Sequence, residues 1–419
     1  MKRSFDSLAL PLFLSGALLQ AAAAPSPSFQ ETWSQWRGPD RDGRYLGEAW
    51  PDSLSENNLR LSWRRELGPG YSSPVLDRRH VYTVETEDEQ REVVRALDRR
   101  TGKQAWESRW DGAMKVPFFA KANGSWVRCT PLLDDDRLYV GGMRDVLVCL
   151  SAKDGKEIWR ADFPKQDETP LPSFGFVSSP VVDQEHIYVQ AGGGFVKLDK
   201  RTGEKVWKSL GDGGGMFGSA FSSPVIGEIQ GKRLALVQTR QNLAGVDLES
   251  GQTLWEEPIK AFRGMNILTP IIFADGLFTS AYGGRSSFFR TARTGKRIRL
   301  TQAWDNKLQG YMSTPVVVGN HAYLHLRNTR MACVDLTDGT INWTSSKTFG
   351  KYLSLVVQND RILALDQKGD LYLLRATPDR LVILDERKVS DQETWAHLAI
   401  ADRQLFVREL NGLRVFDWN

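Results

Sequence analysis

Asp98-Arg-Arg-Thr-Gly-Lys-Gln-Ala-Trp106 decides the fold, because this phrase returns along the chain. It is complete again at 199–207, and related stretches end at Trp159, Trp255 and Trp343. In each copy a strand ends at Leu-Asp or its equivalent, a turn follows, and a second strand carries the tryptophan. The glycine of the turn supplies a backbone conformation that other residues rarely adopt. A repeated strand–turn–strand unit indicates an all-β repeat protein.

A second phrase precedes each copy and marks another strand. It consists of Ser or Thr, then Pro, then mostly β-branched residues, and a strand tolerates Pro at its first position. The six copies are Ser73-Pro74, Thr130-Pro131, Ser179-Pro180, Ser223-Pro224, Thr269-Pro270 and Thr314-Pro315. Ser354-Leu355 and Ala396-His397 stand at the next two expected positions without Pro. Eight such starts divide the chain into units of about 43 residues, the length of a four-stranded propeller blade.

We therefore predict an eight-bladed β-propeller over residues 59–419, with seven blades as the alternative because the last two copies are weak. The chain ends on a third strand, at 413–417, with no fourth strand after it. The stretch 59–67, which carries Trp63, matches the missing fourth strand. Pairing of the first strand with the last would close the ring and remove its open edges. Residues 24–58 are expected to pack on this ring.

The repeated residues are expected to have structural roles. Each tryptophan is large enough to fill the wedge between neighbouring blades; the set is Trp63, Trp106, Trp159, Trp207, Trp255 and Trp343. The repeated aspartates are interpreted as turn-forming carboxylates, because one slot in different blades cannot face a single active site; they are Asp98, Asp199, Asp247 and Asp335. The stretch 290–300 is interpreted as a degenerate copy with Leu300 in place of the tryptophan.

Composition and the first residues bear on class and location. The chain has 419 residues, 41% hydrophobic residues and a net charge of +4, which excludes wholesale disorder and gives no argument for nucleic acid. A basic start, an apolar run and small residues predict a signal peptide at 1–23. No cysteine lies near that cut for lipid attachment, and no later apolar run is long enough to span a membrane. We expect a periplasmic or secreted monomer.

The repeat resembles that of the PQQ-like repeat propellers, over nearly the whole mature chain. The phrase at 98–106 and 199–207 is similar to that family's tryptophan-docking motif. The stretch Trp33-Ser-Gln-Trp36-Arg-Gly-Pro-Asp-Arg-Asp-Gly43 resembles a signature of exported, planctomycete-type members. The family holds quinone-dependent dehydrogenases and non-enzymatic scaffolds, among them the propeller subunit of the outer-membrane β-barrel assembly machinery. The resemblance thus implies the fold and leaves both functions open.

The residues favour the scaffold over the dehydrogenase. Quinoprotein alcohol dehydrogenases hold PQQ between a Trp floor and a ring made by two adjacent cysteines, beside a Ca²⁺ site. This chain has three cysteines, at 129, 149 and 333, and none are adjacent. His321 and His325 lie on one strand, roughly 13 Å apart at about 3.3 Å per residue, too far to share an ion. We predict no catalytic residue, no metal and no cofactor, with PQQ and Ca²⁺ as the alternative.

Propeller ligands are expected on the face that carries the connections from the second to the third strand and between blades. Residues in these loops are candidates for binding an envelope protein, a partner peptide, or an anionic or glycan ligand. They are Tyr71, Arg128, Arg144, Phe176, Arg240, Asn242, Arg285, Tyr311, Arg327, Asn328, Lys351, Tyr352 and Trp395. The first blade offers carboxylates instead, from Glu85 to Glu89. Two alternatives stay open: a solvated rim of charges, and a carbohydrate-binding accessory protein.

Overall fold

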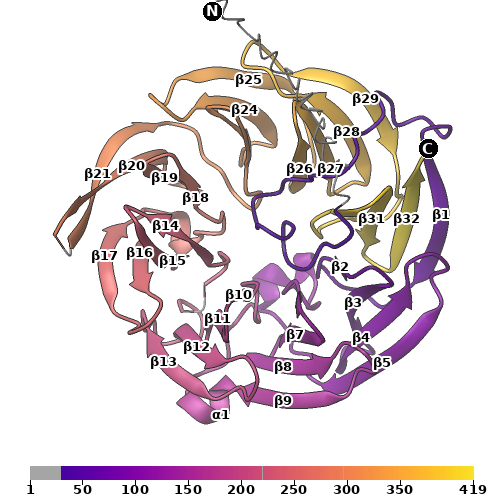
Figure 1. The fold of residues 1–419 in the computed structure, drawn as a ribbon, viewed down its shortest axis with the longest axis horizontal. Coiled ribbons are helices and arrows are strands. Elements are labelled where there is room, and N and C mark those ends of the chain that lie inside the picture. The colour runs from indigo at the N-terminus through magenta and orange to yellow at the C-terminus, as the bar shows by residue number, and fades with distance from the viewer. Residues whose placement is uncertain (1–29, 219, 296) are drawn as a thin grey trace, which may run out of the picture.

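The computed structural model describes residues 30–218, 220–295 and 297–419. The predicted signal peptide, 1–23, lies outside them. Eight antiparallel sheets of four strands stand side by side in a ring (Figure 1). The prediction of an eight-bladed propeller is confirmed, and the seven-bladed alternative is wrong.

Within a blade the strands are called A to D from the axis outward. Blade 1 consists of β2 (Val75–Leu76), β3 (His80–Glu87), β4 (Arg91–Asp98) and β5 (Gln104–Asp111). Blade 2 consists of β6 (Leu132–Asp134), β7 (Arg137–Gly142), β8 (Val146–Ser151) and β9 (Glu157–Asp162). Blade 3 consists of β10 (Val181–Asp183), β11 (His186–Ala191), β12 (Gly194–Asp199) and β13 (Lys205–Ser209). Blade 4 consists of β14 (Val225–Ile229), β15 (Lys232–Gln238), β16 (Asn242–Asp247) and β17 (Thr253–Pro258).

The second half repeats this plan. Blade 5 consists of β18 (Ile271–Phe273), β19 (Gly276–Ser280), β20 (Ser286–Thr294) and β21 (Arg297–Asn306). Blade 6 consists of β22 (Val316–Val318), β23 (His321–His325), β24 (Arg330–Asp335) and β25 (Ile341–Thr348). Blade 7 consists of β26 (Leu353–Gln358), β27 (Arg361–Asp366), β28 (Asp370–Arg375) and β29 (Val382–Lys388). Blade 8 consists of β30 (Ala399–Ala401), β31 (Gln404–Glu409), β32 (Gly412–Trp418) and β1 (Leu59–Glu66).

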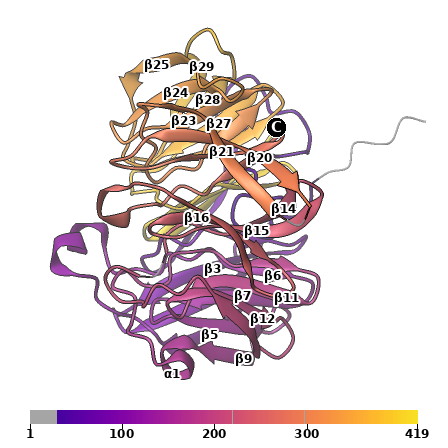
Figure 2. The ribbon, with the colours of Figure 1, turned by 90° about the vertical axis from the view of Figure 1, so that its left-hand side faces the viewer.

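The two faces of the ring carry different connections. The face with the D–A and B–C connections is called the upper face, and the face with the A–B and C–D turns the lower face. Three short helices lie in D–A connections: η1 (Phe118–Asn123), α1 (Phe163–Asp167) and η2 (Phe262–Gly264). In the side view the purple excursion on the left projects well beyond the strands (Figure 2). Loop length is therefore concentrated on the upper face.

The ring closes through the N-terminal strand. Strand β1 pairs with β32 from Leu59 opposite Trp418 to Glu66 opposite Gly412. Next to this pairing, the buried Arg408 donates hydrogen bonds to the carbonyl oxygens of Gly68 and Leu410. A strand from one end of the chain thus completes the sheet begun at the other, as the sequence predicts.

The repeated tryptophans join neighbouring blades. The indole nitrogen of Trp106 donates to the carbonyl oxygen of Ala152 at 2.9 Å, and that of Trp159 donates to Lys200 at 3.1 Å. Trp63, Trp207 and Trp343 make the same kind of bond to the next blade. The rings of Trp63, Trp106, Trp159 and Trp207 also lie against the glycine of that blade's turn, so that a Cβ atom added at Gly203 would stand 2.5 Å from Trp159. These glycine turns are therefore shaped to receive the preceding blade's tryptophan.

Blade 5 departs from this rule, and the sequence-based assignment of Leu300 to the tryptophan position is wrong. Trp304 occupies that position: it pairs with Phe288 and donates to the carbonyl oxygen of Leu336 at 3.0 Å. In blade 1 the equivalent pair is Ala96 and Trp106. The β20–β21 hairpin is thus six residues longer, and the Thr-Gly turn at 294–295 lies further out. The prediction aligned blade 5 with the other blades by its Thr-Gly turn alone, and this placed the tryptophan position of β21 at the wrong residue.

The longer hairpin leaves Trp255 of blade 4 without its acceptor. By analogy with the other blades this acceptor would be the carbonyl of Thr291, which instead accepts from the side chain of Gln230. The indole nitrogen of Trp255 is shielded from solvent and has no hydrogen-bond partner among the described residues. A Cβ atom at Gly295 would touch nothing within 4 Å, so this turn receives no tryptophan. An unsatisfied buried donor costs about 1–3 kcal/mol.

Candidate binding face

The N-terminal segment enters the centre of the ring, where its indigo trace is seen in Figure 1. Trp33 forms a β-bridge with Leu76 of β2, and the carbonyl of Ser34 accepts from Leu133 of β6. Further on, Gly43 and Tyr45 bond the backbone of Val357 in β26. The segment 33–45 thus lies along the inner strands of several blades. We call it the axial plug.

Two buried arginines anchor the axial plug. Arg37 donates to the carbonyl oxygens of Thr314 and Pro315, both at 2.8 Å, and to two carbonyls of the plug itself. Arg41 donates to the carbonyls of Ser179 and Pro180 on the other side of the axis. Burial lowers the pKa of Arg37 to about 10 and that of Arg41 to about 9. Both remain charged at neutral pH and tie the plug to blades 3 and 6.

A belt of hydroxyl groups surrounds the axis above the plug. Each hydroxyl oxygen accepts a hydrogen bond from the backbone N–H of the preceding blade, at 2.7–3.4 Å. The acceptors are Ser73, Thr130, Ser179, Ser223, Thr269 and Thr314. The Ser/Thr of the strand-start phrase therefore satisfies a buried amide of its neighbour, as the fold requires of buried polar groups. The sequence marks these Ser and Thr positions as strand starts but does not predict that their hydroxyl groups accept hydrogen bonds from the neighbouring blade.

The hydroxyl belt forms the wall of an axial pocket that opens on the upper face. Trp36 of the plug lies on the pocket's lining, with the guanidinium carbons of Arg37 and Arg41 each 5.6 Å from its ring centre. Tyr71, Arg128, Tyr352 and Trp395 line it as well. Its volume is about 120 Å³, comparable with a cavity of about 150 Å³ that holds one benzene. The pocket accepts a group of side-chain size.

Aromatic side chains continue outward from this pocket in three contacting groups, which we call the aromatic collar. One group is Tyr71, Trp395 and Tyr352, with ring centres 5.8 and 6.1 Å apart. The second runs from Phe221 through Phe174 and Phe119 to Phe118, and the third joins Phe262, Tyr282 and Tyr311. A guanidinium stacks on each group: Arg128 on Tyr71, Arg240 on Phe221 and Arg327 on Tyr282.

The outer part of the collar is exposed. Phe118 is 89% exposed, Phe217 74%, Phe119 56% and Phe262 45%. All four belong to D–A connections of the upper face. Large apolar side chains left in water on one face are expected where a surface interacts with another molecule. Phe217, in the loop between β13 and β14, is exposed on the same face, and we include it in the aromatic collar.

The structure brings together only some of the predicted binding residues. Tyr71, Arg128, Tyr352 and Trp395 meet at the axial pocket, and Tyr311 and Arg327 meet at Tyr282. The others lie apart on the upper face: Arg144 and Lys351 are exposed, Arg285 pairs with Asp305, Asn242 bonds Glu256, and the side chain of Asn328 accepts from the backbone of Arg330. Trp36, Phe174, Phe262 and Tyr282 were missing from the predicted set.

Two predicted residues have other surroundings than the sequence implies. Phe176 is 2% exposed and packs in the core between blades 2 and 3, so it does not face the mouth. Arg240 is 6% exposed and donates to the carbonyls of Met216, Arg263 and Gly264. It therefore clamps two upper loops together and holds Phe221 beneath its guanidinium. Sequence gives no signal for either, because both depend on how the loops fold back.

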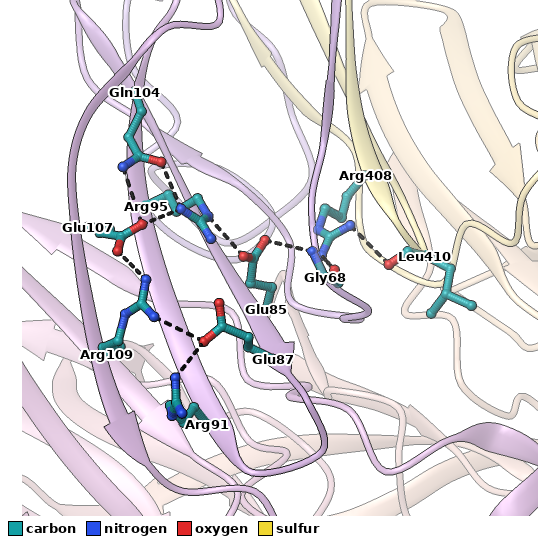
Figure 3. A network of polar contacts seen from close by, with 10 residues as sticks. All are labelled: Gly68, Glu85, Glu87, Arg91, Arg95, Gln104, Glu107, Arg109, Arg408 and Leu410. Carbon is teal, nitrogen blue, oxygen red and sulfur yellow. Dashed lines mark hydrogen bonds and ion pairs between the residues drawn. The ribbon is translucent and has the colours of Figure 1, made fainter.

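Two of the predicted blade 1 carboxylates, Glu85 and Glu87, are neutralised by arginines of their own blade (Figure 3). Arg95 binds both Glu85 and Glu107, and Glu87 accepts from Arg91 and Arg109. Glu85 also accepts the backbone N–H of Gly68 at the ring closure. The difference in charge between the upper loops of blade 1 and those of the cationic blades is therefore smaller than the sequence implies.

Asp145, in the upper loop between β7 and β8, is expected to make stability depend on pH. Its buried carboxylate accepts from Gly192, and burial raises its pKa to about 7, with Asp212 and Asp167 acting in the same direction. Its pKa in the unfolded chain is about 3.9. The native state therefore holds the proton between these values, and the resulting stabilisation is lost as the pH rises from about 4 to about 7.

Asp145→Asn is the variant that checks this expectation. Asn tolerates the positive φ of 58° at this position and keeps an acceptor for Gly192. The free energy of unfolding by urea should fall less steeply with pH in the variant, by up to about 1 kcal/mol per pH unit. Parallel pH profiles for the two proteins would contradict the assignment.

The axial pocket does not fit PQQ with Ca²⁺. Its lining contains Trp36 but no carboxylate that would bind a calcium ion. Among residues 30–218, 220–295 and 297–419, no three His, Cys, Asp or Glu side chains are grouped to hold a metal. Cys129, the cysteine nearest the pocket wall, is buried as a free thiol whose pKa burial raises to about 12.

Comparison with known proteins identifies the family. The model of the family described as outer membrane protein assembly factor BamB matches residues 90–345, more than half of the chain. The chain belongs to this family. The predicted membership among PQQ-like repeat propellers is thereby confirmed.

Relatives within the BamB family are distant. BamB of Shewanella oneidensis is 22% identical over 338 residues, which cover 76% of this chain and 78% of that protein. BamB of Salmonella typhimurium is 26% identical over 335 residues, 67% of this chain and 82% of that protein. No helix among the described residues is long and apolar enough to cross a membrane.

Solved structures share the propeller fold. BamB from Moraxella catarrhalis superposes with a TM-score of 0.63 at 12% identity, covering 86% of this chain and 98% of that one. A quinohemoprotein alcohol dehydrogenase from Comamonas testosteroni gives 0.52 at 13% identity, covering 96% and 82%. At such identities the likeness shows the fold, which enzymes and assembly factors have in common.

Proposed function

We propose that this protein is a non-catalytic scaffold of the cell envelope that binds a protein partner through the aromatic collar. The observation that carries this proposal is the exposure of Phe118, Phe119, Phe217 and Phe262 on one face of the ring. The family supports it, because relatives are named as outer membrane protein assembly factors. The proposed location is the periplasm, at the outer membrane.

The collar has the composition of a protein interface. Aromatic residues and Arg are enriched at the centres of such interfaces, and they carry most of the binding free energy. Here three guanidiniums already stack on aromatic rings at 4.4–5.7 Å, which holds the aromatic surface in place before a partner arrives. The axial pocket at the centre offers room for one partner side chain. This arrangement favours an extended segment or a loop of the partner.

The test compares two triple variants of the mature protein. Phe118→Ser/Phe119→Ser/Phe217→Ser removes the three most exposed of these four phenylalanines. Leu61→Ser/Ile158→Ser/Val206→Ser is the matched control, because these side chains are 41–50% exposed on D strands. Pull-down of outer-membrane assembly proteins from envelope extracts should weaken at least about 30-fold for the collar variant, or about 2 kcal/mol. Equal binding by wild type and both variants would refute the proposal.

A further inference from the structure

We propose that the β20–β21 hairpin of blade 5 is a cationic finger that binds a membrane surface bearing anionic phospholipid headgroups. The finger is defined as the described residues 290–295 and 297–301. It extends from the lower face, opposite the collar. This inference goes beyond the scaffold function and does not depend on which partner the collar binds.

The first argument is that the hairpin breaks the repeat at a cost. Five blades place their tryptophan ten residues after its cross-strand partner, at pairs such as Cys149 and Trp159. Blade 5 places Trp304 sixteen residues after Phe288. The extension leaves the indole nitrogen of Trp255 without an acceptor in the part of the chain that the structure describes. Departures from a protein's own local rules are expected at functional sites.

The second argument is the charge of the hairpin. From Ser286 to Trp304 the sequence contains five basic residues and no Asp or Glu. Arg290 pairs with Asp275, at 3.0 Å. Arg297 and Arg299 are exposed, and neither has an ion-pair partner among the described residues. Lys296 lies outside the described residues, and the proposal rests on the arginines.

The third argument is that the base of the finger is fixed. Ile298 is 4% exposed and packs with Ile229 and Phe289 in the core between blades 4 and 5. Gln230 bonds the backbone and hydroxyl oxygens of Thr291, and Arg293 donates to the carbonyl of Gln230. Cross-strand pairing places Arg297 opposite Thr294 and Arg299 opposite Ala292, on the face away from Ile298. The two arginines are thus held outward on a rigid ribbon.

A lipid surface fits this finger better than a folded partner does. None of the exposed large hydrophobic side chains of the described residues lies in the finger, so it lacks the apolar anchors of a protein interface. Guanidinium groups bind phosphate strongly. Such binding needs phosphate groups near the arginines but no apolar surface of matching shape. Basic residues near an anionic bilayer contribute about 1 kcal/mol each. The finger would hold the lower face toward the membrane and leave the collar free.

The test is co-sedimentation of the full-length mature protein with vesicles. Vesicles of phosphatidylglycerol and phosphatidylcholine in roughly equal parts should bind the wild type at low salt, and pure phosphatidylcholine vesicles should not. Arg297→Gln/Arg299→Gln should weaken binding about 30-fold, which corresponds to about 1 kcal/mol for each arginine. Raised salt should release the protein.

The control is Arg100→Gln/Lys103→Gln, which removes two exposed cations from the equivalent turn of blade 1. It should bind like the wild type, and both double variants should keep the wild-type thermal transition. Absence of vesicle binding, or equal loss in both double variants, would overturn the proposal. Binding of the wild type to polyglutamate or RNA in preference to anionic vesicles would overturn it as well.

Discussion

Replacing Arg37 by Met is expected to lower the free energy of unfolding by about 3–4 kcal/mol, among the largest effects of a single substitution here. The side chain is 1% exposed and bonds four carbonyl oxygens, two of them in blade 6. Met keeps most of the volume but cannot donate. The carbonyls of Thr314 and Pro315 would lose these bonds beneath the axial pocket, and the plug would lose its link to that side of the ring.

The matched control for the plug is Arg60→Met. Arg60 is exposed on β1, so its loss is expected to change stability by less than about 0.5 kcal/mol. Equilibrium unfolding in urea, followed by tryptophan fluorescence, measures both variants. If Arg37→Met and Arg60→Met unfolded at the same urea concentration as the wild type, the plug would contribute nothing to holding the ring.

Gly203→Ala is expected to destabilise the ring by about 2–4 kcal/mol, and Gly295→Ala by only about 1 kcal/mol. Both glycines have positive φ, 75° and 61°, so both substitutions place a Cβ atom in a strained conformation. At Gly203 that atom would also stand 2.5 Å from the ring of Trp159, whereas at Gly295 nothing lies within 4 Å. The difference between the two variants therefore isolates the contact with the docked tryptophan.

Thermal unfolding monitored by circular dichroism measures this difference. Gly155→Ala, which would meet Trp106 at 2.4 Å, should behave like Gly203→Ala. Equal transitions for Gly203→Ala and Gly295→Ala would contradict the account of tryptophan docking. They would also remove the reason to treat blade 5 as an exception.

The fold was largely predictable because its determinants are local in sequence. A glycine turn and a tryptophan ten residues after its cross-strand partner recur in five blades, and this spacing is independent of the rest of the chain. Trp304 escaped the prediction because the hairpin is six residues longer, so that the tryptophan follows the turn glycine by nine residues instead of four. Ring closure was predictable for the same reason as the repeat, since the stretch around Trp63 carries the pattern that the last blade lacks.

The candidate site was predictable only in part, because it depends on contacts between distant segments. Loop position alone found Tyr71, Arg128, Tyr352 and Trp395 at the axial pocket. It did not find Trp36, which reaches the pocket through a plug folded from the N-terminal segment. It also took Arg240 for a free cation, because loop carbonyls that bond a guanidinium have no signature in sequence.

The most direct test of the central claim is site-specific photocrosslinking in intact cells. A benzophenone side chain in place of Phe217, on the collar, is compared with one in place of Ile158, on a D strand away from it. The account predicts a discrete adduct with an outer-membrane assembly protein from position 217 and none from position 158. Adducts of equal yield and identity from both positions, or none from position 217, would contradict a partner bound at the collar.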